Sequence, residues 1–239
     1  MNQAEFQEQL LQVMEQKEHW AWSQFTGGVV AKGKLHIHME QEYEVYVRDF
    51  PILIGKAYVQ CPIAQVRQEL AENLFEEETG GLHAGRPHPE LFLLYPEGLG
   101  MDLERFNRIT LLPNAKKYRE YLHQSCGSLG WEIGTAISTL FVEGTKHDRS
   151  VLDANAPARP APPLKDHPLV RHYGLDVSYL ALTKAHRGVE GEHRDSAWRC
   201  VTQFVAEDKR PLVVDAMSRA LTLWKSYRDD VAIACGLSR

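Results

Sequence analysis

Cysteine is scarce in this chain, and its few cysteines are never close together. No CxxC pair is present among Cys61, Cys126, Cys200 and Cys235. A cysteine zinc site needs closely spaced ligands, and a disulfide framework is typical of short secreted chains. We therefore expect four buried thiols in a cytoplasmic protein, with neither disulfides nor a cysteine-bound metal.

Long apolar runs and basic clusters are also missing. No segment approaches the roughly 20 apolar residues that span a bilayer, and the polar, amphipathic start of the chain lacks the features of a signal peptide. The net charge of −5 gives no support for a nucleic-acid partner. We expect a small-molecule substrate, and neither a membrane nor a nucleic acid as partner. The sequence leaves open a homodimer and an external electron donor.

Strand patterns are absent too, because apolar and polar residues nowhere alternate for more than about five residues. The hydrophobic content of 44% and the charged content of 25% are ordinary for a soluble globular protein. Apolar residues recur instead at three-to-four spacing along most of the chain. The fold class we expect is all-α, with a single domain over residues 1–239.

The helical pattern is divided into stretches by glycine and proline. Gly80 and Gly81 end one stretch in the manner of a helix C-cap, and Pro51 and Gly55 predict a kink inside another. The expected helical stretches are residues 3–18, 35–60, 63–79, 88–100, 114–125, 130–148, 169–206 and 210–236.

One composition break interrupts this pattern. Five prolines fall within residues 157–168, and prolines at this density do not continue a helix. We expect an irregular insert over about residues 154–168 that lengthens a connection within the single domain.

The stretch HRGVEGEH, residues 186–193, contains three potential metal ligands. His186, Glu190 and His193 are spaced i, i+4 and i+7, which places them on one face only if the segment is helical. The flanking residues favour a helix, but Gly188 and Gly191 each cost roughly 1 kcal/mol relative to alanine in a helix interior. The alternative is a solvated break between two helices.

Carboxylates on apolar helix faces are the other candidate ligands, because a helical bundle holds a dinuclear metal site with inward carboxylates and imidazoles. Glu143 follows an apolar stretch, although it could also lie in water at a helix end. Glu77 continues the apolar stripe of Val66 and Leu70, although three consecutive glutamates usually form a solvated face. His88 precedes a proline, and its alternative role is simply to begin a helix.

These motifs, taken in order, resemble those of the haem-oxygenase-like diiron oxidases, relatives of pyrroloquinoline-quinone synthase and the thiaminase-like proteins. The resemblance runs from about residue 15 to the C-terminus. Two departures are a glutamate, Glu190, where the family has aspartate, and a few extra residues between Glu77 and His88. The matching segments are EYEVYVRDFP, NLFEEETG, HPELF, GLG at residues 98–100, and HRGVEGEH. The metal ligands implied by the resemblance are Glu77, His88, Glu143, His186, Glu190 and His193.

The resemblance implies a bundle of about seven to nine helices, two Fe(II) ions and dioxygen as cofactors, and a non-haem diiron oxidase or oxygenase. The substrate it favours is a small amino acid, with halogenated tryptophan converted to a nitrile in natural-product biosynthesis as the specific expectation. A fatty-acid decarboxylase or an N-oxygenase is the alternative within this chemistry. A metal-free thiaminase-like hydrolase or a cofactor-independent oxidase is the alternative within the fold, and a non-catalytic interaction protein is the alternative outside enzymes.

Candidate substrate contacts lie in the segment EYEVYVRDFP, which precedes the ligand motifs in the sequence. Tyr46 and Phe50 offer aromatic walls, and Arg48 offers a guanidinium that could hold a carboxylate in a bidentate manner. The alternative for Arg48 is an ion pair with Glu44, four residues earlier on the same helix.

Overall fold

The computed structural model describes residues 1–153 and 161–239. The side chains of Val151 and residues 188–193 lie outside the described part. Within it the chain forms α-helices and short 3₁₀ or π turns without a strand, so the predicted all-α class is confirmed. The helices are α1 (Gln3–Glu15), α2 (Trp22–Thr26), α3 (Leu35–Glu42), α4 (Phe50–Gln60), α5 (Ala64–Thr79), α6 (His88–Gly98), α7 (Pro113–Ser128), α8 (Trp131–Thr135), α9 (Asp148–Leu152), α10 (Pro168–Tyr173), α11 (Ala181–Phe204) and α12 (Arg210–Ala234).

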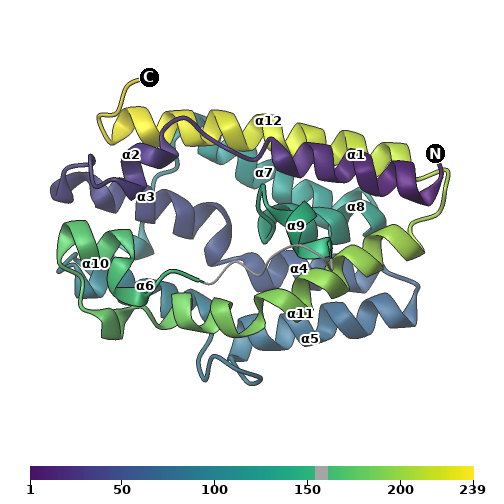
Figure 1. Cartoon of the computed structure of the whole chain (residues 1–239), viewed down its shortest axis with the longest axis horizontal. Helices are drawn as coiled ribbons and strands as arrows, with labels where there is room; N and C mark the ends of the chain where they lie inside the picture. The colour runs from purple at the N-terminus through teal and green to yellow at the C-terminus, as the bar shows by residue number, and fades with distance from the viewer. Residues whose placement is uncertain (154–160) are drawn as a thin grey trace.

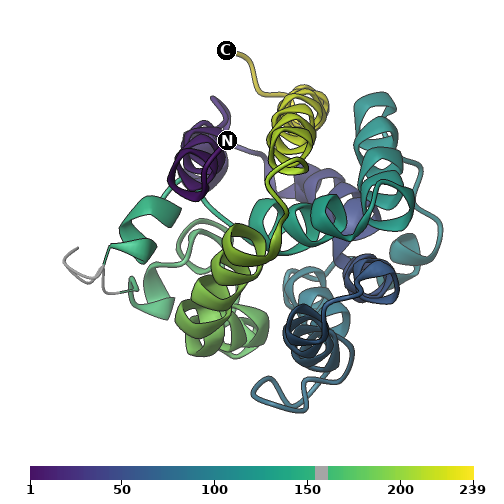
Figure 2. The ribbon, with the colours of Figure 1, turned by 90° about the vertical axis from the view of Figure 1, so that its right-hand side faces the viewer.

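The bundle is elongated, with its longest helices near its edges. Helices α1 and α12 run side by side along one edge, and α5 and α11 run side by side along the opposite edge (Figure 1). The view from the end shows α7 beside α12 (Figure 2), and α4 packs against α5, α7 and α8. Tyr118 of α7 and Tyr227 of α12 stack with ring centroids 5.6 Å apart, both almost fully buried.

A π-helical segment, η4 (Ala136–Val142), passes through the centre of this arrangement. Residues 136–141 are all buried, and the segment contacts α4, α7, α8, α11 and α12. Its polar side chains, Ser138 and Thr139, donate to the backbone carbonyls of Gly134 and Thr135. A segment that is otherwise apolar all round is stable only when protein surrounds it. Glu143 follows directly after η4, so a buried segment positions this carboxylate.

The described residues form twelve α-helices rather than the expected seven to nine. The predicted helix over 35–60 is divided into α3, a π turn η2 (Tyr43–Val47) and α4. Pro51 lies in the first turn of α4, where proline is tolerated because no helical N–H is lost. The predicted helix over 169–206 is divided at Gly174, which has a left-handed φ of 73°.

Other sequence predictions have clear outcomes. Gly80 ends α5 with φ 64°, as expected for a C-cap, and all four cysteines are free and buried. Residues 154–160 of the proline-rich insert lie outside the described residues, and the rest of it contains the 3₁₀ turn η5 (Leu164–Asp166). Among the described helices, none combines the length and the apolar character needed to cross a membrane.

Candidate metal centre

A cavity of about 280 Å³ lies among η2, α4, α5, α6, the end of η4 and α11. One part of its wall is apolar or aromatic, and another carries carboxylates, imidazoles and a guanidinium. The lining residues are Tyr46, Val47, Phe50, Glu77, His88, Val142, Glu143, Leu182, His186 and Arg194.

Three of the predicted ligands converge in this cavity from three different helices. One potential ligand atom from each of Glu77, His88 and His186 lies within 4.8 Å of the others. The Nδ1 atom of His88 is 2.8 Å from Oε1 of Glu77. The rings of His88 and His186 are 5.2 Å apart at an angle of 63°. Helices α5, α6 and α11 thus bring one carboxylate and two imidazoles to a common point.

His88 is buried, yet neither of its ring nitrogens has a hydrogen-bond partner among the described residues. The close contact with Glu77 is therefore an ion-pair contact that lacks hydrogen-bond alignment. A buried polar atom without a partner is costly, and a cation held by His88 and Glu77 would remove this cost. Imidazole and carboxylate ligands together suit iron, so the residues present fit the metal.

The three consecutive glutamates have different surroundings. Glu76 is 1% exposed and accepts hydrogen bonds from the backbone N–H groups of Leu82, His83 and Ala84 at 2.8, 3.1 and 2.9 Å. Burial alone would raise the pKa of Glu76, but these hydrogen bonds lower it below its ordinary value. Glu78 is exposed. Only Glu77 of the three lines the cavity.

Glu143 reaches the same cavity from the end of η4. Its Oε1 accepts a hydrogen bond of 2.7 Å from Nδ2 of the buried Asn73. Burial raises the pKa of Glu143 to about 7, although the Asn73 hydrogen bond opposes this shift. A carboxylate in such a site gains more from a nearby cation than an exposed one does.

His186 is exposed, and it also lines the cavity. The surrounding protein lowers its pKa to about 4, with His88 as a second cause. The imidazole is therefore neutral at physiological pH, which is the form that binds a metal.

The backbone of HRGVEGEH is helical within α11, so the predicted helix is confirmed. The side chains of Glu190 and His193 lie outside the described residues, and their roles stay predictions. Helical spacing places their positions near that of His186 on the helix face.

The proposed substrate contacts separate into two groups. Tyr46 and Phe50 line the cavity. Arg48 does not, because its guanidinium pairs with Glu44 and with Asp49, whose Oδ1 is 2.8 Å from Nε. This is the ion pair that the sequence offered as the alternative for Arg48.

Arg194 is a cavity residue that the sequence reasoning missed. It is 7% exposed, donates a hydrogen bond of 2.7 Å to the carbonyl of Thr139 and pairs with the buried Asp148. It follows His186 and Glu190 at one more step of four residues on α11. Extending the i, i+4 spacing by that step would have identified it.

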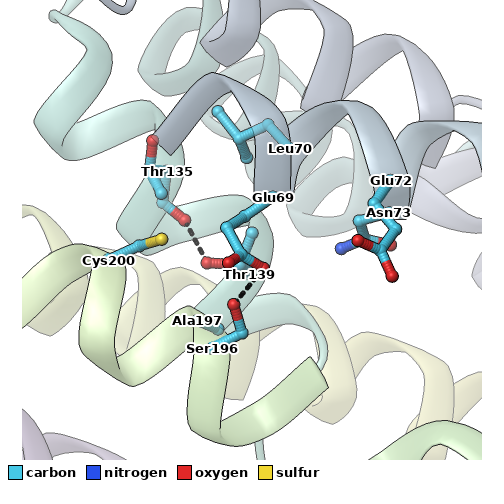
Figure 3. A pocket seen from close by; sticks show the side chains of 9 residues that line it. All are labelled: Glu69, Leu70, Glu72, Asn73, Thr135, Thr139, Ser196, Ala197 and Cys200. Carbon is cyan, nitrogen blue, oxygen red and sulfur yellow. Dashed lines mark hydrogen bonds between the residues drawn. The ribbon is translucent and has the colours of Figure 1, made fainter. Parts of the chain in front are cut away.

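A second, smaller cavity of about 30 Å³ lies between α5, η4 and α11 (Figure 3). It brings Cys200 near Glu69, which is the residue pair that a cysteine hydrolase would need. Its volume is sufficient for about one water molecule, and Glu69 already accepts a hydrogen bond from Ser196. Burial raises the pKa of Cys200 to about 11. The thiol is therefore protonated and has no room for a substrate.

The chain was compared with protein families and with curated proteins. The family model described as iron-containing redox enzyme, which carries the name of haem oxygenase, matches residues 38–225, more than half of the chain. No curated protein matches well enough to add a more specific relationship. The match agrees with the all-α bundle and with the imidazole and carboxylate cluster in its cavity. The chain belongs to the haem-oxygenase-like family of iron-containing redox enzymes.

Proposed function

We propose that the protein is a non-haem diiron oxidase or oxygenase that uses dioxygen to oxidise a small substrate in the cavity. The observation that carries the proposal is the convergence of Glu77, His88 and His186 from three helices, with one potential ligand atom of each within 4.8 Å of the others.

Two Fe(II) ions would be held by the three clustered residues together with Glu143, Glu190 and His193. When bound, iron supplies the reactivity toward dioxygen that the protein side chains lack. Asn73 orients Glu143 through its hydrogen bond. The three backbone hydrogen bonds of Glu76 fix the turn that follows the ligand helix. Such supporting contacts determine how firmly ligands hold a metal.

The cavity volume of about 280 Å³ is at the lower end of the range for ligand pockets, roughly 300–1,000 Å³. We favour an amino acid with an aromatic side chain, and we retain oxidation of a halogenated tryptophan to a nitrile as the specific candidate. Tyr46 and Phe50 would pack against the ring. Arg194 is better placed than Arg48 to attract the carboxylate. A fatty-acid decarboxylase would need an extended apolar channel, and an N-oxygenase would use the same cavity. Dependence on an external electron donor and assembly as a homodimer remain part of the proposal.

The metal content of purified protein tests the diiron proposal. After anaerobic loading with Fe(II) and removal of free iron, we expect about two iron ions per chain, as in related bundles. His186→Ala should lower this content, whereas His83→Ala, in the exposed turn after α5, should not. Less than about half an iron per wild-type chain would overturn the proposal.

The substrate class has a separate test. Mixing the Fe(II) protein with oxygenated buffer should consume dioxygen faster when the correct substrate is bound. We expect tryptophan analogues to accelerate consumption and medium-chain fatty acids to have no effect. The reverse result would reject the amino-acid assignment and leave the diiron assignment intact.

A further inference from the structure

A chain of three polar side chains leads from the protein surface to the cavity. Tyr46 lines the cavity and donates its hydroxyl hydrogen bond to Oε1 of Glu42. The other carboxylate oxygen of Glu42, Oε2, lies 2.9 Å from Nε2 of His38. The three residues are spaced i, i+4 and i+8 along α3 and the π turn η2. Single π turns of this kind are frequent at functional sites.

Arg228 of α12 holds the middle of this chain in place. Its guanidinium donates to Oε1 of Glu42 at 2.8 Å and to the hydroxyl oxygen of Tyr46 at 3.3 Å. The guanidinium is packed between aromatic rings, including those of Trp224 and Tyr227 at 5.4 and 5.0 Å. A buried charge pair of this kind is costly to maintain. Among the candidate ligands whose side chains the structure describes, none contacts Arg228 or Glu42.

We propose that Tyr46 delivers protons to the cavity and that Glu42 and His38 replace them. This inference rests on the proposed function, because reduction of dioxygen consumes protons. In the transfer, the Tyr46 O–H bond breaks as its proton passes to a basic atom in the cavity. The Tyr46 oxygen takes a proton from Glu42, and Glu42 takes one from Nε2 of His38. No residue changes its oxidation state.

The charges around His38, Glu42 and Tyr46 require the three proton transfers to be coupled. Burial, and then the neighbouring carboxylate of Glu42, raise the pKa of Tyr46 well above its ordinary value. Burial alone would raise the pKa of Glu42, but Arg228 and His38 hold it well below its usual range. Four further titratable groups interact electrostatically with this pair, namely Lys17, Tyr95, Tyr118 and Tyr227. A tyrosinate beside a carboxylate is therefore too unstable to persist, and the lost proton must be replaced as it leaves.

His38 provides the outer end of the chain. Its side chain is 17% exposed and packs against Phe25 with ring centroids 4.8 Å apart. Its Nδ1 is buried without a hydrogen-bond partner among the described residues, so the ring meets solvent only along its exposed edge. Histidine commonly serves as the outer group of proton shuttles.

Variants at each step test the proposal against matched controls. Tyr46→Phe and His38→Ala should each slow the reaction of the Fe(II) protein with dioxygen, on the order of 10²-fold for lost acid catalysis. The double variant should be no slower than either single variant, because both interrupt one path. Two control variants should react at the wild-type rate: Tyr43→Phe, in the same π turn but outside the cavity lining, and His36→Ala, two residues before His38. Independent effects of Tyr46→Phe and His38→Ala would overturn the relay.

Chemical rescue distinguishes a relay from a structural role. Imidazole added to His38→Ala should restore the reaction rate and the solvent isotope effect of the wild type, because it can occupy the vacated space. It should not rescue Tyr46→Phe. A slow His38→Ala variant that imidazole does not accelerate, with normal iron content and thermal stability, would assign His38 a structural role and overturn the proposal.

A measurement on the metal-free protein separates the relay from the diiron chemistry. We expect NMR titration of labelled tyrosine and histidine to show that Glu42→Gln lowers the pKa of Tyr46, which the Glu42 carboxylate raises. The same variant should shift the imidazole signals of His38, whose Nε2 lies 2.9 Å from Glu42, while Tyr43→Phe changes neither residue. Absence of this coupling overturns the relay even if the iron protein reacts normally. If the coupling is present but wild-type iron protein does not react with dioxygen, the proposed function fails and the relay has no role in it.

Discussion

Glu76 and Glu77 are neighbours in the sequence and have opposite roles in the structure. The carboxylate of Glu76 is saturated by three backbone N–H groups, so it stabilises the turn after α5 and has little capacity left for a metal. Glu77 points into the cavity toward His88. At the scale of single residues, the number of hydrogen bonds already made separates a structural carboxylate from a candidate ligand.

Replacing Glu76 should therefore damage the fold more than replacing Glu78. Glu76→Ala removes the acceptor for three amide groups, and we expect a loss of about 2–3 kcal/mol in the free energy of unfolding. Glu78→Ala, on the exposed side of the last turn of α5, should change it by less than about 0.5 kcal/mol. Urea unfolding of both metal-free variants measures the difference. Equal stabilities would mean that the turn does not depend on Glu76.

The cysteines should be unimportant for activity. Burial raises the pKa of Cys126 to about 12 and that of Cys200 to about 11, so neither is an available nucleophile. Cys126→Ala and Cys200→Ala should retain at least about half of the wild-type dioxygen consumption and lose only about 1 kcal/mol of stability. An inactive cysteine variant with normal iron content would return the hydrolase alternative to consideration.

At the scale of elements, Asp49, the residue just before α4, makes the stability of the fold depend on pH. Asp49 is buried and pairs with Arg48 and with Arg119 of α7. Burial alone would raise the pKa of Asp49, but these two guanidinium groups lower it to about 2 from an ordinary value of 3.8. The aspartate anchors the start of α4, and the next residue, Phe50, lines the cavity.

This shift has a defined effect on stability. Because the folded pKa is depressed, the Asp49 contribution is present above about pH 4 and is lost as the pH falls toward 2. A shift of this size corresponds to about 2 kcal/mol. Asp49→Asn should therefore lower the free energy of unfolding at pH 7 and reduce its dependence on pH between 4 and 2. Urea unfolding across this range measures both effects, and an unchanged slope would contradict the assignment.

Helix α11 gives the second prediction at this scale. It carries Gly188 and Gly191 between the candidate ligands, and each glycine weakens a helix interior by roughly 1 kcal/mol. Binding of metal to ligands on successive turns should offset this cost. Amide hydrogen exchange over residues 186–193 should be slower in the iron-loaded than in the metal-free protein, while α12 changes little. Equal protection in both forms would show that α11 does not depend on metal.

The elements also show which predictions a sequence supports. The stripe of Val66, Leu70 and Glu77 lies within one helix, so periodicity alone placed Glu77 toward the core. No periodicity in the sequence predicts the π turns η2 and η4, because their geometry depends on packing against the surrounding helices. The ion pair between Arg228 and Glu42 joins residues 186 positions apart, and no local pattern relates them. Arg48 and Glu44 are four apart, and their pairing was foreseeable.

At the scale of the whole molecule, the N-terminal helix reaches the candidate metal centre. Lys17, just after α1, donates hydrogen bonds to the carbonyls of Val142 and Gly144 at 3.2 and 2.7 Å and to that of Phe141. Two of these carbonyls flank Glu143. The end of η4 would otherwise leave several carbonyl groups without a donor.

Lys17→Met should therefore weaken metal binding from a distance. Methionine keeps the apolar stem but removes the donors. Burial, with Arg194 and Arg228 nearby, lowers the pKa of Lys17 to about 7, so we expect each lost hydrogen bond to cost about 0.5–1.5 kcal/mol, as for an uncharged donor. We expect lower stability and a lower iron content than in Lys32→Met, an exposed control on another turn. Retention of full iron content in a destabilised Lys17→Met variant would show that the Lys17 hydrogen bonds support the fold but not metal binding.

The contacts of Arg228 limit how far the protein can be truncated. The family match covers residues 38–225, and its limits fall inside α3 and α12. A protein cut at these limits would retain Glu42 but lose Arg228, its buried partner, and it would also lose Lys17. The stretch of the chain that similarity detects is therefore shorter than the stretch that folds and functions together. Truncations should keep α1 and the whole of α12.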